Sequence, residues 1–153
     1  MTSNVVQIPT GPRWRVLIAH QRGMVRHALR TMIEAQDVAV VEVADGEAAL
    51  AELAFRRFDL LVLEVDLPKE DGISVVLMHR LLLANQLSRV APPDIVFALA
   101  PEVRSNASLT DELQKLGIAG LIDDSPRSDV ARLVESILQA RAAVPATGKP
   151  AAA

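Results

Sequence analysis

The chain has 153 residues, half of them hydrophobic, with a net charge of −3 and no cysteine. This length fits one domain with its own core, and the lack of thiols excludes disulfides, thiolate metal sites and thiol nucleophiles. A slightly acidic chain with 3% aromatic residues is not expected to bind nucleic acid. No apolar run is long enough to span a bilayer and residues 1–12 lack a signal peptide's features, so we expect a cytoplasmic protein without membrane contact.

Apolar runs and amphipathic stretches alternate along the chain. Short continuous apolar runs indicate strands buried on both faces. We expect strands at residues 15–19, 38–43, 60–65, 95–99 and 119–122, and helices at residues 23–35, 47–56, 73–87, around 109–116 and from Pro126 onward. Asp45 is expected to cap the helix at residues 47–56. Because each parallel connection needs a crossover, this alternation predicts an α/β fold with a parallel sheet covered by helices on both faces.

The two ends of the chain differ from the part between them. Residues 1–12 show no periodicity, and residues 142–153 are small and interrupted by Pro. Both compositions are typical of disordered segments. We therefore expect one domain at residues 13–141, between a disordered N-terminal segment and a disordered C-terminal tail.

Candidate functional residues follow the predicted strands. In open parallel sheets, ligands bind beyond the carboxyl ends of the strands. The residues at those ends are His20, Gln21, Glu64, Leu99 and Asp124. We expect these five side chains to lie near one edge of the sheet.

Three segments resemble the response regulator receiver domain of two-component systems. The first is the run Val-Leu-Ile-Ala at residues 16–19, which precedes a helix rich in Leu and Arg. The second is residues 43–50, Val-Ala-Asp-Gly-Glu-Ala-Ala-Leu, and the third is residues 58–72, where a strand leads to Glu64, Pro68 and an Asp-Gly pair. The resemblance covers about residues 13–141. It implies a flavodoxin-like (βα)5 doubly wound parallel sheet with strand order 2-1-3-4-5.

The resemblance also implies a phosphorylation pocket, most of whose residues differ in this chain. Receiver domains take a phosphoryl group onto an aspartate, using Mg²⁺, two acidic residues, a Thr or Ser, and a Lys. Here the acidic pair falls on His20 and Gln21, the acceptor on Glu64, the Thr or Ser on Leu99, and the Lys on Asp124. An imidazole and an amide are poor Mg²⁺ ligands, Leu99 lacks a hydroxyl, and Asp124 repels phosphate.

We therefore interpret the chain as a degenerate, pseudo-receiver domain. It is expected to be no enzyme, to hold no cofactor or metal, and to act through protein–protein contact. Because no DNA-binding segment follows residue 141, its output is expected to pass through a partner, such as a histidine kinase or a phosphotransfer protein.

Two alternatives stay open. The chain could be a single-domain response regulator that is phosphorylated at an unusual site, Glu64 or Asp66. It could also be a metal-dependent hydrolase on the same fold, with His20, Glu64 and Asp124 as ligands. The simpler interpretation of that trio is a protonated His20 paired with two carboxylates. Glu64 itself is either a residual polar group at a strand end or a permanent mimic of a phosphorylated aspartate.

Arg22, Arg26 and Arg30 are spaced four residues apart on the first predicted helix. They lie opposite its apolar stripe, so we expect them to be exposed. In the family, this helix belongs to the surface that meets the kinase or phosphotransfer partner. The three arginines are therefore a candidate docking site for an acidic partner surface.

The third predicted helix has more apolar residues than one buried face requires. They are Val75, Val76, Leu77, Met78, Leu81, Leu82 and Leu83. A partner, or a second copy in a homodimer, is expected to cover part of that surface. His79 on this helix and His27 on the first helix have polar neighbours, so we expect both to be solvated.

Overall fold

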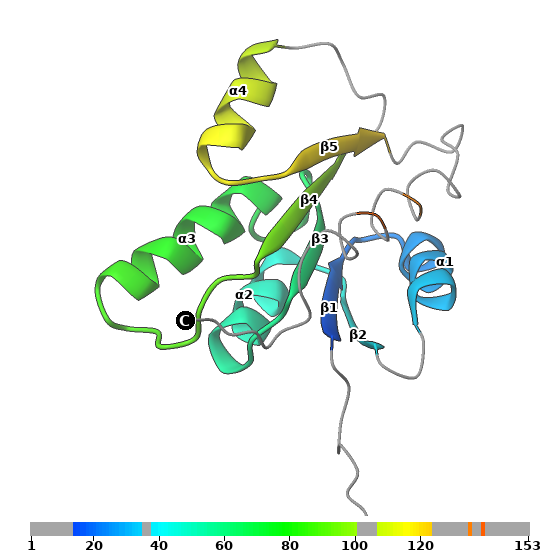
Figure 1. Ribbon diagram of the computed structural model, residues 1–153, viewed down its shortest axis with the longest axis horizontal. Coiled ribbons are helices and arrows are strands. Elements are labelled where there is room, and N and C mark those ends of the chain that lie inside the picture. The colour runs from blue at the N-terminus through cyan, green and yellow to red at the C-terminus, as the bar shows by residue number, and fades with distance from the viewer. Residues whose placement is uncertain (1–13, 35–37, 101–106, 124–134, 136–138, 140–153) are drawn as a thin grey trace, which may run out of the picture.

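The structure is a computed structural model that describes residues 14–34, 38–100, 107–123, 135 and 139. Strands and helices alternate along these residues (Figure 1). The strands are β1 (Trp14–Ala19), β2 (Val38–Val43), β3 (Leu60–Glu64), β4 (Ile95–Ala100) and β5 (Gly120–Asp123). The helices are α1 (Gly23–Ile33), α2 (Gly46–Phe55), α3 (Gly72–Ala84) and α4 (Ala107–Lys115). None of the described helices is long and apolar enough to cross a membrane.

The strands form one parallel sheet in the order β2-β1-β3-β4-β5. The predicted order is thus confirmed for β2-β1-β3-β4, the strands that carry the candidate site, and β5 pairs in parallel with β4. The helix predicted from Pro126 onward and the two predicted disordered ends lie outside the described residues.

The continuous apolar strands are buried on both faces, as their composition predicts. Alternate residues of one strand belong to different cores. In β1, Val16 and Ile18 pack with Leu29 and Ile33 of α1. Leu17 and Ala19 pack on the other face, with residues of α2, α3 and α4 such as Ala49, Leu53, Val75, Val76 and Leu113. The sheet therefore holds its carboxyl-end residues between two packed layers.

The segment between β3 and α3 is packed against the start of α2. The Gly46 N–H donates to the Pro68 carbonyl at 3.0 Å, and a Cβ on Gly46 would collide with the Glu70 backbone carbonyl. The Asp45 carboxylate caps α2 by accepting from the Ala48 N–H at 2.7 Å, as the sequence predicts. That hydrogen bond is the main reason why the pKa of Asp45 is lowered. These contacts fix the loop that follows Glu64.

Helix α3 ends at Ala84, three residues before the predicted end at residue 87. Asn85 caps it, and Gln86 adopts a left-handed conformation with φ of 60°. At the other end, the Asp71 carboxylate accepts from the Ser74 N–H at 2.8 Å. The apolar pattern alone did not mark the end, because Leu83 and Leu87 both fit it.

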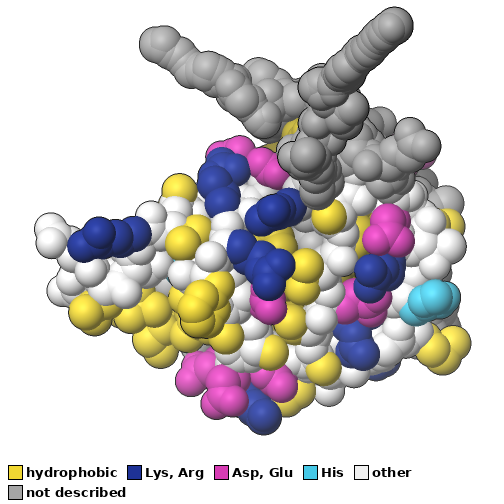
Figure 2. All heavy atoms as spheres, turned by 90° about the horizontal axis from the view of Figure 1, so that it is seen from below, with side chains coloured by type: hydrophobic (Ala, Val, Ile, Leu, Met, Phe, Trp, Pro, Cys, Tyr) yellow, Lys and Arg dark blue, Asp and Glu magenta, His cyan; other side chains and the backbone are white. Residues whose placement is uncertain are grey.

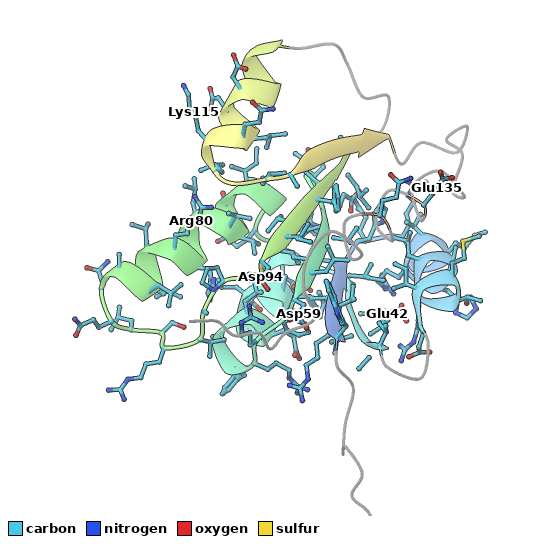
Figure 3. All side chains as sticks on the ribbon, viewed as in Figure 1. Glu42, Asp59, Arg80, Asp94, Lys115 and Glu135 are labelled. Atoms are coloured by element: carbon cyan, nitrogen blue, oxygen red, sulfur yellow. The ribbon has the colours of Figure 1, made fainter. Side chains whose placement is uncertain are left out.

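Arg57 joins the beginnings of β3 and β4. Its guanidinium contacts the Asp59 carboxylate at 2.9 Å and the Asp94 carboxylate at 2.7 Å. Asp59 and Asp94 lie together at this edge, far from the carboxyl ends of the strands (Figure 3). The hydrogen bond to Asp94 is the main reason why the pKa of Arg57 is raised. This network secures the edge opposite the candidate site.

His79 is buried, and the expectation that it is solvated is wrong. Its side chain lies between α3 and α2 with 2% exposure. Its Nε2 atom has no hydrogen-bond partner among the residues that the structure describes. Burial lowers the pKa of this imidazole, and a hydrogen bond with the backbone of Leu53 acts weakly in the opposite direction. Because α3 is apolar on nearly every side, the sequence did not reveal which side faces the core.

The buried His79 makes stability depend on pH. With its pKa lowered in the folded state, the unfolded state binds the proton more readily. The stabilising contribution of neutral His79 should thus be complete above its unfolded pKa of about 6.5 and be lost as pH falls from there toward the folded value. Urea unfolding at about pH 7.5 and about pH 5.5 should show a larger loss of stability for the wild type than for His79→Gln. Equal losses in the two proteins would contradict this account.

Candidate functional site

The predicted site residues of three strands meet at one edge of the sheet. Glu64 ends β3 and is paired in register with Leu99 of β4. Ala19 of β1 is paired with Leu63, so His20 and Gln21 leave β1 beside Glu64. Asp124 lies outside the described residues. The parallel topology therefore brings together four of the five residues that the sequence pointed to.

Both carboxylate oxygens of Glu64 accept hydrogen bonds from Gln21. The Gln21 backbone N–H donates to Oε1 and its side-chain Nε2 donates to Oε2, each at 3.0 Å. The same Nε2 group also donates to the Asp66 carbonyl at 3.2 Å. Glu64 is 4% exposed, so these bonds replace most of the water that a carboxylate would otherwise hold. Gln21 thereby connects the end of β1 to the loop after β3.

His20 lies beside Glu64 without donating to it from Nδ1. The imidazole is fully buried, and its Nδ1 atom is 3.7 Å from Glu64 Oε1. That Nδ1 accepts from the Arg22 N–H at 3.0 Å. The two residues are therefore neighbours, as expected, and the His20 side chain also holds the backbone at the start of α1.

Leu99 belongs to the core below the site. It is fully buried among Ile18, Val62 and Phe97. Its carbonyl accepts from the Val65 N–H at 2.8 Å, which continues the sheet past Glu64. Its side chain has no hydroxyl that could hold a phosphoryl oxygen. Leu99 therefore contributes apolar packing where the resemblance implies a hydroxyl group.

The residues at this edge do not fit Mg²⁺. The ion prefers several oxygen ligands and strict geometry. The two positions expected to be acidic hold an imidazole and an amide, and both oxygens of Glu64 accept from Gln21. Among the described residues, no group of three or more His, Cys, Asp or Glu side chains is placed to hold a metal ion.

The two arginines of α1, Arg26 and Arg30, are held by acidic residues and, for Arg26, by backbone carbonyls. Arg26 donates to the His20 carbonyl at 2.7 Å and to the Gln21 carbonyl at 3.3 Å, and its Nε atom is 3.4 Å from Glu42. Arg30 contacts Glu42 at 2.9 Å and Glu34 at 3.4 Å. The hydrogen bond to Glu42 is the main reason why the pKa of Arg30 is raised.

The expectation that all three arginines are exposed is therefore confirmed for Arg22, while Arg26 and Arg30 are only partly exposed. The side chain of Arg26 is 22% exposed and that of Arg30 is 39% exposed. Glu42 projects from β2 toward α1, so both arginines turn toward the sheet edge (Figure 3). Arg26 in particular supports the segment that presents Gln21 to Glu64. Helical spacing placed these residues on one face, but it could not show that an acidic residue of β2 lies next to it.

Comparisons with known proteins agree with this fold. Residues 16–90 match the model of the response regulator receiver domain family. The chain is 32% identical over 100 residues to a gliding motility regulatory protein of Myxococcus xanthus, a match that covers 65% of this chain and 12% of that protein. The chain thus spans only a small part of this relative.

Solved structures share the fold at low sequence identity. A chemotaxis response regulator of Vibrio cholerae has a TM-score of 0.65 and 18% identity, covering 85% of this chain and 98% of that one. The receiver domain of a sensor histidine kinase from Pseudomonas aeruginosa, which has magnesium coordinated in its active-site cleft, has a TM-score of 0.61 and 21% identity, with 86% and 97% covered. Residues 16–90 thus match the response regulator receiver domain family, and the solved structures share the fold of the chain.

Proposed function

We propose that this receiver domain signals by protein–protein contact without being phosphorylated at Glu64. The observation that carries the proposal is the pairing of Glu64 with Gln21. A phosphoacceptor carboxylate must present one oxygen to the phosphorus atom while Mg²⁺ neutralises the phosphoryl oxygens. Here both oxygens accept hydrogen bonds from one neighbouring residue.

The residues around Glu64 support the same conclusion. His20 and Gln21 stand where a receiver domain has its metal-binding acids, and Leu99 stands where it has a hydroxyl. The likeness to the magnesium-bound Pseudomonas domain is one of fold, at 21% sequence identity. Glu64 is also longer than Asp by one methylene, which displaces its carboxylate from the position of an attacking aspartate.

The Gln21 side chain offers a physical substitute for the missing ligands. It stabilises the buried Glu64 carboxylate and holds the Asp66 carbonyl, so the loop after β3 is fixed without phosphate or metal. We propose that this fixed arrangement is the signalling state. The chain then presents one constant surface to its partner. The signalling output is controlled by the abundance of this chain or by the partner's own state.

The partner of this surface is proposed to be a histidine kinase or a phosphotransfer protein. Arg22 is exposed at the start of α1, next to the segment that carries Gln21. It is the most exposed member of the arginine row and so the best placed to meet an acidic partner, whereas Arg26 and Arg30 lie partly buried against Glu42. We further propose that the segment after β5 supplies the fifth helix that completes a (βα)5 fold.

Phosphodonors are expected to leave the protein unmodified. After incubation with acetyl phosphate and Mg²⁺, intact-mass spectrometry should show no phosphorylated species, because Glu64 is engaged and the metal ligands are missing. Stoichiometric addition of one phosphoryl group would contradict the proposal. Loss of that addition in Glu64→Gln, or in Asp66→Asn, would then identify the unusual acceptor.

Arg26 is expected to contribute to stability by holding the Gln21 segment. Arg26→Glu removes two hydrogen bonds to backbone carbonyls and places a second carboxylate beside Glu42, which should reduce the free energy of unfolding by about 2 kcal/mol. Arg89→Glu makes the same charge change at an exposed residue and should alter stability by no more than about 0.5 kcal/mol. Chemical denaturation measures both. Equal effects in the two variants would show that Arg26 has no supporting role.

A further inference from the structure

The loop between β3 and α3 carries one of the groups that hold the Gln21 side chain. The Asp66 carbonyl accepts from the Gln21 side-chain amide at 3.2 Å, and the same amide donates to Glu64 Oε2 at 3.0 Å. The amide nitrogen has two N–H donors, which keep a fixed angle because the group is planar. The position of the Asp66 carbonyl therefore helps to determine whether the other N–H reaches Glu64.

The middle of this loop is held by the first residue of α2. The Gly46 N–H donates to the Pro68 carbonyl at 3.0 Å, and the same carbonyl accepts from the Glu70 N–H at 2.8 Å. A Cβ on Gly46 would collide with the Glu70 backbone carbonyl. The loop and α2 therefore approach each other more closely than any side chain at position 46 would allow.

Lys69 adopts a left-handed conformation beside this contact. Its φ is 70°, which costs free energy in a residue that has a Cβ. Its Nζ atom is 3.6 Å from the Asp45 carboxylate and 3.9 Å from the Glu47 carboxylate. Because these two residues flank Gly46 in the sequence, both ion pairs draw the loop toward the same point of α2. The unfavourable conformation of Lys69 is thus supported by its partners.

The base of the loop is closed separately from this contact. The Gly72 N–H donates to the Val65 carbonyl at 2.8 Å, which joins the two ends of the loop and leaves the Asp66 carbonyl to Gln21. Leu67 is 5% exposed and packs in the core that includes Ala49 of α2. Beyond its closed base, the described loop is therefore located by α2.

We infer that Gly46 is a positioning residue for the Glu64 site, which acts through the loop and its Asp66 carbonyl on the Gln21 amide. The inference rests on the proposed function, in which the pairing of Gln21 with Glu64 is the signalling state. Lys69 reinforces the contact with a smaller effect, because its side chain is 58% exposed and its ion pairs are screened by solvent. The signalling state then depends on α2 as well as on β1 and β3.

The test measures the coupling between Gln21 and Glu64 by double-mutant cycles of unfolding in several backgrounds. Gly46→Ala should reduce the coupling to less than about half of its wild-type value, because the added Cβ displaces the loop from α2. Lys69→Glu places a carboxylate beside the two acidic residues at the start of α2 and should reduce the coupling by about a quarter. Lys69→Arg keeps the positive charge and should retain the coupling.

Hydrogen exchange gives a second measure that does not need the cycle. The side-chain amide protons of Gln21 should exchange with solvent at least about tenfold faster in Gly46→Ala than in the wild type, as measured by NMR. A purely structural role of Gly46 would lower the global stability without this selective change. Circular dichroism checks that Gly46→Ala is folded, and Lys69→Glu, at an exposed side chain, carries the test if it is not.

Two controls separate positioning from stability. Ala51→Gly weakens α2 at an exposed residue beyond its first turn. Away from the loop, Lys and Arg side chains lie among Asp and Glu side chains on the face seen from below (Figure 2). Arg56, just after α2, contacts Glu52 at 3.1 Å, and Arg56→Glu breaks this ion pair at the end of the helix opposite the loop. Both controls should keep the wild-type coupling.

The outcomes distinguish this inference from the proposed function. Coupling and amide exchange that are the same in Gly46→Ala and in the wild type would overturn the inference and leave the proposed function standing. No coupling in the wild type would overturn both. An equal loss of coupling in Ala51→Gly would also overturn the inference, since the stability of α2 and not its contact with the loop would then be responsible.

Discussion

The buried carboxylate of Glu64 needs hydrogen-bond donors, and the arrangement of the sheet edge follows from that need. A charged group removed from water is costly unless it is paired or hydrogen-bonded. With 4% exposure, Glu64 meets this requirement through the backbone and side chain of Gln21. In a metal-dependent receiver, cations would meet the same requirement. In this chain a neutral amide does so.

The parallel sheet makes this solution possible. Because β1 and β3 are adjacent and parallel, the residues that follow Ala19 and Leu63 emerge at the same edge. The contacts around that edge keep the two loops in place. Arg26 holds the carbonyls of His20 and Gln21, and the Gly46 N–H holds the Pro68 carbonyl. Protein hydrogen bonds therefore hold both loops at this edge.

Strand positions and the location of the site were predictable from the sequence. Apolar runs such as residues 60–63 indicate a strand that is buried on both faces. Because the strands are parallel, their carboxyl ends then meet at one edge of the sheet. The capping of α2 by Asp45 could also be predicted, because a cap depends only on residues three positions apart in the sequence. Glu64, Gln21, His20 and Leu99 came together as predicted.

Hydrogen-bond partners and burial around helices were not predictable in the same way. Spacing indicated that His20 and Glu64 are neighbours, but the choice of Gln21 as the donor depends on backbone geometry after β1. The contact of Arg26 and Arg30 with Glu42 depends on how α1 packs over β2. His79 was misjudged because α3 has no polar stripe that separates its inner side from its outer side.

A double-mutant cycle between Gln21 and Glu64 tests the central claim most directly. The free energies of unfolding of the wild type, Gln21→Ala, Glu64→Ala and the double variant give the coupling between the two side chains. Because hydrogen bonds to charged groups contribute about 1.5–3 kcal/mol, the account predicts a favourable coupling of about that size. A coupling near zero would show that Gln21 does not stabilise the Glu64 carboxylate and would contradict the account.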